Sequence, residues 1–402
     1  MTGSPTDNHP RDPKVVIESA EFIVSRSKLV DLNHSGINRV AEQIDKQIRS
    51  GLYSPHTWSE QPLHHLPPWP LDENIDIFSL ESPARSTIDW IFLVSLLNFS
   101  FWSALPSGER FAIEWLPPRS LDGNTRWEGY WALPAALNRA LENGVPITDP
   151  KFYASQEDCP DSLIEKVFKP APGCLERIPL LEERIRVMRQ AGAILVERYN
   201  GSFSGLLAEW RQEHGPKATA GVLVAKIATT FDVFRDENTY KDRVGEFFFW
   251  KRAQILVAET WAAFYPPPGA VAPHPIFPLG VTELTMFADY RVPQILHHLG
   301  TLDYSPALVS MLVNGENLPN GSEAEMSIRA GGILAVEGIK NRILDIRRRK
   351  PATNSLDSEV CSVLIDFFLW DLAKRVESTE GEEGSAKSPL LSPIHRTRSI
   401  WY

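Results

Sequence analysis

Residues 246–263 read EFFFWKRAQILVAETWAA, and this segment decides which class of fold the chain adopts. Its apolar side chains recur at the helical period and cover almost the whole circumference of the helix that they predict. A helix that is apolar on every side is buried among other elements. The segment therefore predicts a central helix inside a large hydrophobic core.

The sequence on both sides of this segment follows the same helical period. Helices are expected within residues 18–48, 127–143, 180–199, 203–210, 222–230, 284–299, 328–348 and 360–375, and strand alternation only at 111–115. Helices joined by short loops favour one integrated domain. We therefore predict a mainly α fold, with residues 15–402 forming a single compact helical domain.

Three segments are expected to lie outside regular helices. Residues 1–14 are polar and Pro-rich, which predicts a disordered N-terminal tail. Residues near 53–80 are rich in Pro and His and predict a surface insertion remote from the motifs described below. Residues near 377–392 are rich in Glu, Ser and Gly and predict a mobile loop.

The charge balance limits the partners of the chain. Its 402 residues include 41 Lys+Arg and 51 Asp+Glu, which gives a formal charge of −10 at pH 7. This argues against duplex DNA or an anionic membrane as the main partner. The longest apolar run, near residues 90–97, is too short to span a bilayer, and the N-terminus has no apolar signal segment. We expect a soluble cytoplasmic protein with no direct DNA or membrane partner.

The sequence predicts neither a metal site nor a cofactor. The three cysteines lack zinc-finger spacing, and the adjacent His297 and His298 cannot share one face of a helix. The Gly-containing stretch 331–338 lacks the strand before it that a dinucleotide-binding loop requires.

Lys251 lies in the middle of an apolar stripe of the predicted helix, which is formed by Phe247, Ile255 and Ala258. Burying the ammonium group costs free energy unless the group meets an anion or loses its proton. The alternative is a lysine whose long side chain reaches water or a local carboxylate.

The segment LTMFADYRVPQILHHL at 284–299 is helical in period but is interrupted by Pro293. If a helix begins at Pro293, then Asp289 and Tyr290 lie in the turn before it, where a carboxylate can be aimed at a ligand. The alternative is that Asp289 pairs with Arg291 or caps the helix.

Two further kinds of segment carry candidate binding groups. NFSFW at 98–102 and EGYW at 128–131 place aromatic rings beside hydrogen-bonding groups, which suits a flat heteroaromatic ligand as well as an ordinary core. FDVFRDE at 231–237 holds three carboxylates, whose alternative role is a solvated loop in which Arg235 pairs with Asp232 or Asp236.

Several segments together resemble the queuosine salvage protein family. They are LLNFSFW (96–102), GYWAL (129–133), ALNRALENGVPIT (136–148), FWKRAQILVAETW (249–261), TMFADYRVPQILHHLG (285–300), LWDLA (369–373) and IHRTRSIWY (394–402). The family hydrolyses queuosine 5′-phosphate and releases queuine, a 7-deazaguanine base that is then inserted into certain transfer RNAs. The resemblance implies an all-helical fold similar to that of helix-hairpin-helix DNA glycosylases. It also implies a catalytic pair at Lys251 and Asp289.

The implied reaction assigns a role to each candidate. A carboxylate stabilises the positive sugar of the transition state, and a lysine either assists the leaving base as an acid or attacks as an amine. We expect simple hydrolysis, with arginines on the phosphate, aromatic rings on the base and acidic residues on its polar groups. The substrate-binding candidates are Phe99, Phe101, Tyr130, Trp131, Asp232, Asp236, Arg252, Tyr290 and Arg291.

Two other functions are weighed against this one. A non-catalytic module that binds modified nucleosides or transfer RNA would not need a buried lysine beside an offset aspartate, and the −10 charge argues against extended phosphate contacts. A DNA base-excision glycosylase would need a basic stripe, which the sequence lacks.

Overall fold

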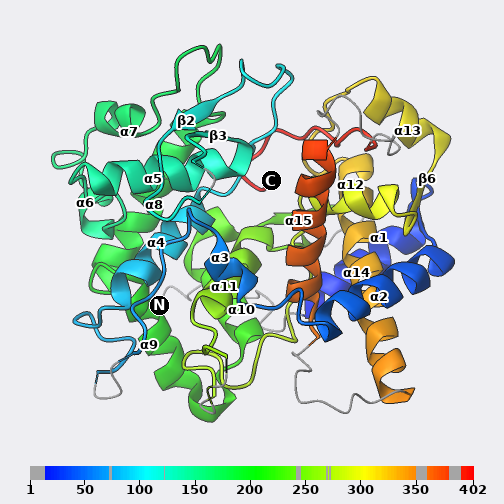
Figure 1. Cartoon of the computed structure of the whole chain (residues 1–402), viewed down its shortest axis with the longest axis horizontal. Coiled ribbons are helices and arrows are strands. Elements are labelled where there is room, and N and C mark those ends of the chain that lie inside the picture. The colour runs from blue at the N-terminus through cyan, green and yellow to red at the C-terminus, as the bar shows by residue number, and fades with distance from the viewer. Residues whose placement is uncertain are drawn as a thin grey trace, which may run out of the picture.

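The computed structural model describes residues 14–71, 75–121, 123–240, 246–268, 270, 273–349, 360–379 and 391–402. This part of the chain is mainly helical, as predicted (Figure 1). Its α-helices are α1 Lys14–Arg26, α2 His34–Arg49, α3 Thr57–Glu60, α4 Arg85–Leu96, α5 Ala132–Glu142, α6 Pro150–Ala154, α7 Asp161–Val167, α8 Leu181–Arg198, α9 Phe203–His214, α10 Ala220–Thr230, α11 Lys251–Ala263, α12 Arg291–His298, α13 Pro306–Val313, α14 Glu323–Arg349 and α15 Ser362–Thr379. Among the described residues, no helix is long and apolar enough to cross a membrane.

Short antiparallel strand pairs tie distant parts of the chain together. They are β1 Val30–Leu32 with β6 Leu302–Tyr304, β2 Ala112–Glu114 with β3 Arg126–Glu128, and β4 Glu237–Asn238 with β5 Phe247–Phe248. Strand β2 confirms the strand expected at 111–115. The other strands are too short for alternation to reveal them in the sequence, because two or three residues do not define a period.

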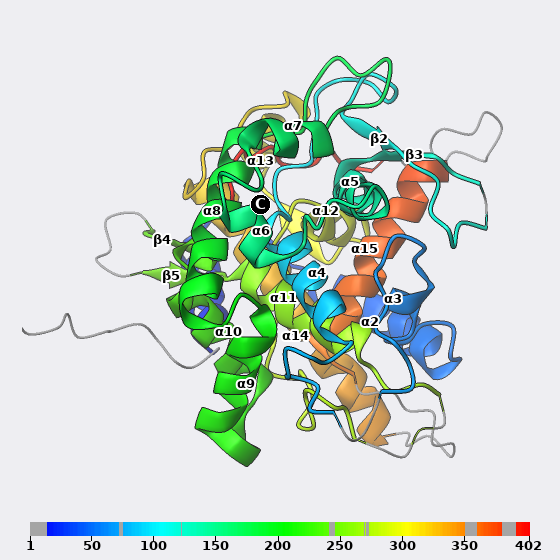
Figure 2. The ribbon, with the colours of Figure 1, turned by 90° about the vertical axis from the view of Figure 1, so that its left-hand side faces the viewer.

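Helix α11 is the buried centre that its sequence predicts. Every residue from Lys251 to Ala263 is buried, and the helix packs against α3, α4 and α10. Figure 2 shows α11 in the middle of the ribbon, flanked by α4 and α10.

The start of α11 differs from the sequence-based expectation of a helix from residue 246. Trp250 adopts a left-handed backbone (φ 49°, ψ 36°), and Phe247 and Phe248 form strand β5. A left-handed residue cannot continue into a right-handed helix, so α11 begins at Lys251. Lys251 therefore lies at the N-terminus of the helix and not in its interior.

The helices form two groups, with α15 standing between them in Figure 1. One group surrounds α14, which packs against α1, α2, α12 and α15. The other contains α11 with its neighbours and the pairs α4–α9 and α6–α8.

The helix expected at 284–299 is also shorter than its period predicts. Helix α12 begins at Arg291, so Asp289 and Tyr290 lie in the turn before it, as one of the two alternatives required. Pro293 is the third residue of the helix and not the first. Proline is tolerated there because the N–H groups of a first turn have no partner within the helix.

The Pro-rich segment 53–80 differs most from expectation. It does not stand away from the core, because Tyr53, Trp58, Leu63 and Phe78 are buried. Proline limits the length of helices here, but it does not prevent aromatic side chains from packing. The tail expected at 1–14 falls outside the described residues except for Lys14, where α1 begins, and so does most of the loop expected at 377–392.

Helix α2 approaches the turn after α12 very closely at Gly36. A Cβ atom added to Gly36 would lie 1.7 Å from the carbonyl oxygen of Gly300, which is a backbone atom and cannot rotate away. Only glycine allows this approach between α2 and the turn after α12.

The substitution Gly36→Ala should lower the free energy of unfolding by about 2–3 kcal/mol, because the backbone of either α2 or the turn at Gly300 must move. Urea unfolding followed by circular dichroism measures the change. The matched control is Gly338→Ala, where the added methyl meets only side-chain atoms of Ile37 at 3.3 Å. That variant should change stability by less than about 1 kcal/mol. Equal losses in the two variants would contradict the account.

Candidate active site

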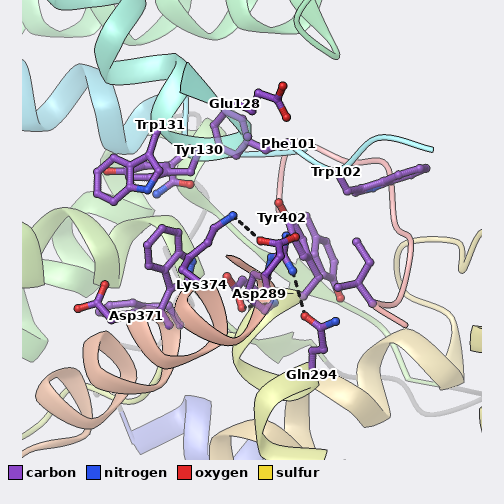
Figure 3. A pocket seen from close by; sticks show the side chains of 18 of the residues that line it. Phe101, Trp102, Glu128, Tyr130, Trp131, Asp289, Gln294, Asp371, Lys374 and Tyr402 are labelled. Carbon is purple, nitrogen blue, oxygen red and sulfur yellow. Dashed lines mark hydrogen bonds and ion pairs between the residues drawn. The ribbon is translucent and has the colours of Figure 1, made fainter. Parts of the chain in front are cut away.

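A cavity of about 650 Å³ opens between the two helix groups. Its wall is built from residues 53–64, residues 98–111, residues 128–131, helix α11, residues 287–294, helix α15 and the segment 393–402. This volume is in the range of sites that enclose a small molecule. Figure 3 shows side chains from these segments converging around Asp289.

Lys251 reaches the cavity from the first turn of α11. Its side chain is almost fully buried, and Nζ donates a hydrogen bond of 3.2 Å to the carbonyl oxygen of Asn98. Burial lowers the pKa of Lys251 to about 8, against the opposing effect of the Asp289 charge. The ammonium form therefore still predominates at neutral pH, within reach of deprotonation.

Asp289 lines the same cavity from the turn before α12. Its Oδ1 accepts hydrogen bonds of 2.8 Å from the backbone N–H groups of both Arg291 and Val292. Burial raises the pKa of Asp289, while the charge of Lys251 and these two hydrogen bonds oppose the rise. The side chain therefore caps the helix, as one alternative predicted, and the cap fixes the carboxyl group on the cavity wall.

The two segments are held by the buried ion pair between Asp236 and Arg329, and Arg329 also pairs with buried Glu325 at 3.3 Å. Arg329 donates from Nη1 to Asp236 Oδ1 at 3.0 Å and from Nη2 to Oδ2, and its guanidinium lies 4.0 Å from the ring centroid of Phe249. Asp236 Oδ2 also accepts the backbone N–H of Lys251 at 3.2 Å. On the other side, Arg329 Nε donates to the carbonyl oxygen of Ala288 at 3.0 Å. The pair therefore joins the residue before Asp289 to the first residue of α11.

Five of the predicted substrate-binding residues line the cavity with Lys251 and Asp289. They are Phe101, Tyr130, Trp131, Tyr290 and Arg291. The rings of Tyr130 and Trp131 lie 4.9 Å apart, and Phe101 meets Tyr130 edge to face at 5.9 Å. These rings form an aromatic wall above Asp289 in Figure 3.

Phe99 and Arg252 lie behind the wall of the cavity, which corrects the expectation that they touch the substrate. The Arg252 guanidinium donates to the backbone carbonyls of Leu96 and Val233. Phe99 is fully buried, with the guanidinium of Arg184 4.3 Å from its ring centroid. Both side chains belong to the core. A buried guanidinium is stabilised by carbonyl acceptors and by the face of an aromatic ring.

The acidic candidates Asp232 and Asp236 also lie away from the cavity. Asp232 is 86% exposed in its side chain and pairs with Arg235 at 2.9 Å, which is the solvated-loop alternative. Asp236 is buried, and both of its carboxylate oxygens are taken by Arg329. Neither carboxylate is placed to meet a ligand in the cavity.

Sequence reasoning missed several carboxyl groups that line the cavity, and three of them lie on its central helices: Glu259 on α11, and Asp366 and Asp371 on α15. Asp366 accepts the backbone N–H of Phe287 at 2.9 Å, and Asp371 accepts the hydroxyl of Tyr53 at 2.8 Å. Burial raises the pKa of each of the three. A carboxylate in a helix that is otherwise apolar was the available signal for Glu259.

Cations also line the cavity, and two of them share a carboxylate. Arg291 pairs with Glu377 at 2.6 Å and Lys374 pairs with the same residue at 3.0 Å, while Arg291 also donates to Gln294 at 3.1 Å. A group with more negative charge than one carboxylate can bind here. Within the described part of the chain, no group of three or more His, Cys, Asp and Glu side chains is arranged to hold a metal ion.

Comparison with known proteins matches this chain over nearly its whole length. The model of the queuosine salvage protein family matches residues 78–402. Three relatives bear the name queuosine 5′-phosphate N-glycosylase/hydrolase. The protein of Schizosaccharomyces pombe is 39% identical over 393 residues, which cover 96% of this chain and 99% of that protein. The mouse protein is 36% identical, with 96% and 98% covered, and that of Sphaerobacter thermophilus is 34% identical, with 98% and 99% covered. The chain therefore belongs to the queuosine salvage protein family.

Proposed function

We propose that this chain hydrolyses the N-glycosidic bond of queuosine 5′-phosphate and releases queuine for insertion into transfer RNA. The observation that carries the proposal is the meeting of Lys251 and Asp289, both buried and both shifted in pKa, in one cavity with an aromatic wall. Buried ionisable groups with perturbed pKa values in a cleft are typical of catalytic sites. The relatives with this activity in their names cover almost the whole chain.

Asp289 is the group that faces the sugar in this proposal. Cleavage of the bond builds positive charge on the ribose, and a carboxylate beside C1′ stabilises that charge and orients the attacking water. Because two backbone N–H groups hold Oδ1, the carboxylate keeps its orientation without reorganisation during the reaction.

Lys251 assists the leaving base as an ammonium group. The 7-deazaguanine base has no N7 to protonate, so its departure depends on positive charge and hydrogen bonds nearby. The lowered pKa of about 8 leaves Lys251 mostly protonated at neutral pH and makes its proton easier to transfer. This favours acid assistance and simple hydrolysis over attack by Lys251 as a free amine.

The remaining parts of the substrate have matching surfaces in the cavity. We place the base between the rings of Phe101, Tyr130 and Trp131, since aromatic faces stack on a flat heterocycle. The phosphate is placed at Arg291, with Lys374 beside it on α15. Arg291 is two residues from Asp289, which suits a phosphate carried on the same ribose.

The likeness to helix-hairpin-helix DNA glycosylases stays a prediction.

The substitution Asp289→Asn should lower turnover at least roughly 10³-fold while leaving substrate affinity within a few-fold. The amide oxygen of Asn can still accept the N–H groups of Arg291 and Val292, so the cap on α12 is kept and only the negative charge is lost. Mass spectrometry of released queuine measures turnover, and isothermal calorimetry measures affinity.

The matched control is Asp232→Asn, the same exchange at a carboxylate that faces solvent, and it should release queuine at the wild-type rate. Turnover within tenfold of wild type in Asp289→Asn would remove Asp289 from the mechanism.

The pH profile of kcat/KM should fall above about pH 8, because the ammonium of Lys251 is lost as the pH rises through its lowered pKa. On the acid side the rate should fall as Asp289 gains a proton at a pKa above its ordinary value. The protonation of the substrate phosphate, near pH 6, overlaps that acid limb. The alkaline limb is therefore the decisive one.

Two controls isolate Lys251 in the alkaline limb. The variant Glu259→Gln removes a second cavity group whose pKa is about 8. The substrate 7-deazaguanosine 5′-phosphate lacks the basic alkylamine that queuosine 5′-phosphate carries on C7. The alkaline limb should persist in both cases, and a flat profile between pH 7 and pH 10 in either would refute the assigned ionisation of Lys251.

A further inference from the structure

Glu259 is a buried acid that the proposed chemistry leaves without a role. It lies on α11 eight residues after Lys251, which places it about 12 Å farther along the helix axis. Lys251, Ile255 and Glu259 all line the same cavity. Lys251 and Glu259 therefore lie at different positions along one cavity.

The hydrogen bonds of Glu259 are incomplete. Oε1 accepts a hydrogen bond of 3.3 Å from the hydroxyl of Tyr130, whereas Oε2 is buried with no hydrogen-bond partner among the described residues. The residue is only 6% exposed, and burial raises its pKa to about 8. A buried carboxyl oxygen without a hydrogen-bond partner costs free energy. A ligand that supplies this partner would therefore gain binding free energy.

The surroundings of Glu259 favour a cationic partner. Its neighbour Tyr130 contacts Trp370 edge to face at 5.8 Å, and the next residue on α15 is Asp371, a second cavity carboxyl with a raised pKa. Figure 3 shows Asp371 and Trp131 on the left of Asp289, away from Trp102 and Gln294. No cation among the described residues opposes the effect of burial on the pKa of Glu259, and a bound ammonium group would supply one.

We propose that Glu259 binds the secondary ammonium of the substituent on C7 of the base and so makes the site selective for queuosine nucleotides over guanine-like ones. The proposal rests on the proposed function and deepens it. In this arrangement the substrate lies with its phosphate at Arg291, its C1′ between Lys251 and Asp289, and its amine at Oε2 of Glu259. The aromatic rings around that amine add a cation–π contribution.

The test compares two substrates in the wild type and in Glu259→Gln. Queuosine 5′-phosphate carries the amine, and 7-deazaguanosine 5′-phosphate has the same ring edge without it. In the variant, kcat/KM for queuosine 5′-phosphate should fall roughly 10–100-fold, the usual loss for a hydrogen bond to a charged group. The value for 7-deazaguanosine 5′-phosphate should stay within about threefold. The variant Glu259→Asp, which keeps the charge, should recover part of the loss.

The outcomes separate the two levels of the proposal. If the wild type cleaves neither substrate, the proposed function fails. Suppose that the wild type cleaves queuosine 5′-phosphate and that kcat/KM falls equally for both substrates in Glu259→Gln. Glu259 then contacts the part of the base that both substrates share, and the inference is overturned. An unchanged ratio of the two kcat/KM values overturns it as well.

A measurement on the wild type keeps the inference testable if the variant does not fold. Calorimetric titration with queuine at pH 7 in two buffers of different ionisation enthalpy counts the protons released on binding. Binding of an ammonium group to a Glu259 that is protonated in the free protein should release close to one proton more than binding of 7-deazaguanine does. Equal proton release by the two bases would overturn the inference.

Discussion

The buried ion pair between Asp236 and Arg329 is the interaction on which the arrangement of the site depends. Asp236 accepts the backbone N–H of Lys251, and Arg329 donates to the carbonyl of Ala288, immediately before Asp289. Two loops from distant parts of the chain are thus fixed to one charged unit. Removing one member of such a pair leaves an uncompensated buried charge, at a cost of about 3–5 kcal/mol. The geometry of the cavity is therefore coupled to the stability of the core.

The sequence predicted the features that depend on local pattern. The helical period revealed most helices, and Lys251 and Asp289 stood out because one interrupts an apolar stripe and the other precedes a proline. Features that depend on distant contacts could not be predicted in this way. Asp232 and Asp236 look alike in FDVFRDE, yet one faces solvent and the other meets Arg329, 93 residues later in the chain. The partner of Glu259 is Tyr130, 129 residues away, so the apolar helix around Glu259 marked the residue but not this contact.

The cavity carries cationic groups at one place and buried acidic groups at another. Arg291 and Lys374 hold a single carboxylate between them, so they can accept a more negative group. Glu259 has no such compensating cation, and its pKa stays raised. A nucleotide with a phosphate at one end and an ammonium at the other matches both. In the proposed arrangement, the aromatic wall holds the base, and Lys251 and Asp289 lie on either side of the bond that is cut.

The substitution Arg329→Lys tests whether the Asp236–Arg329 pair positions Lys251 and Asp289. Lysine keeps a positive charge opposite Asp236, but its single ammonium cannot reproduce the planar fork that also reaches the carbonyl of Ala288. The account predicts that kcat falls roughly 10–100-fold in a variant that is folded by circular dichroism, because Lys251 and Asp289 lose their alignment. Substrate affinity should stay within a few-fold. A folded Arg329→Lys variant with the wild-type kcat would contradict the claim that this pair positions the catalytic groups.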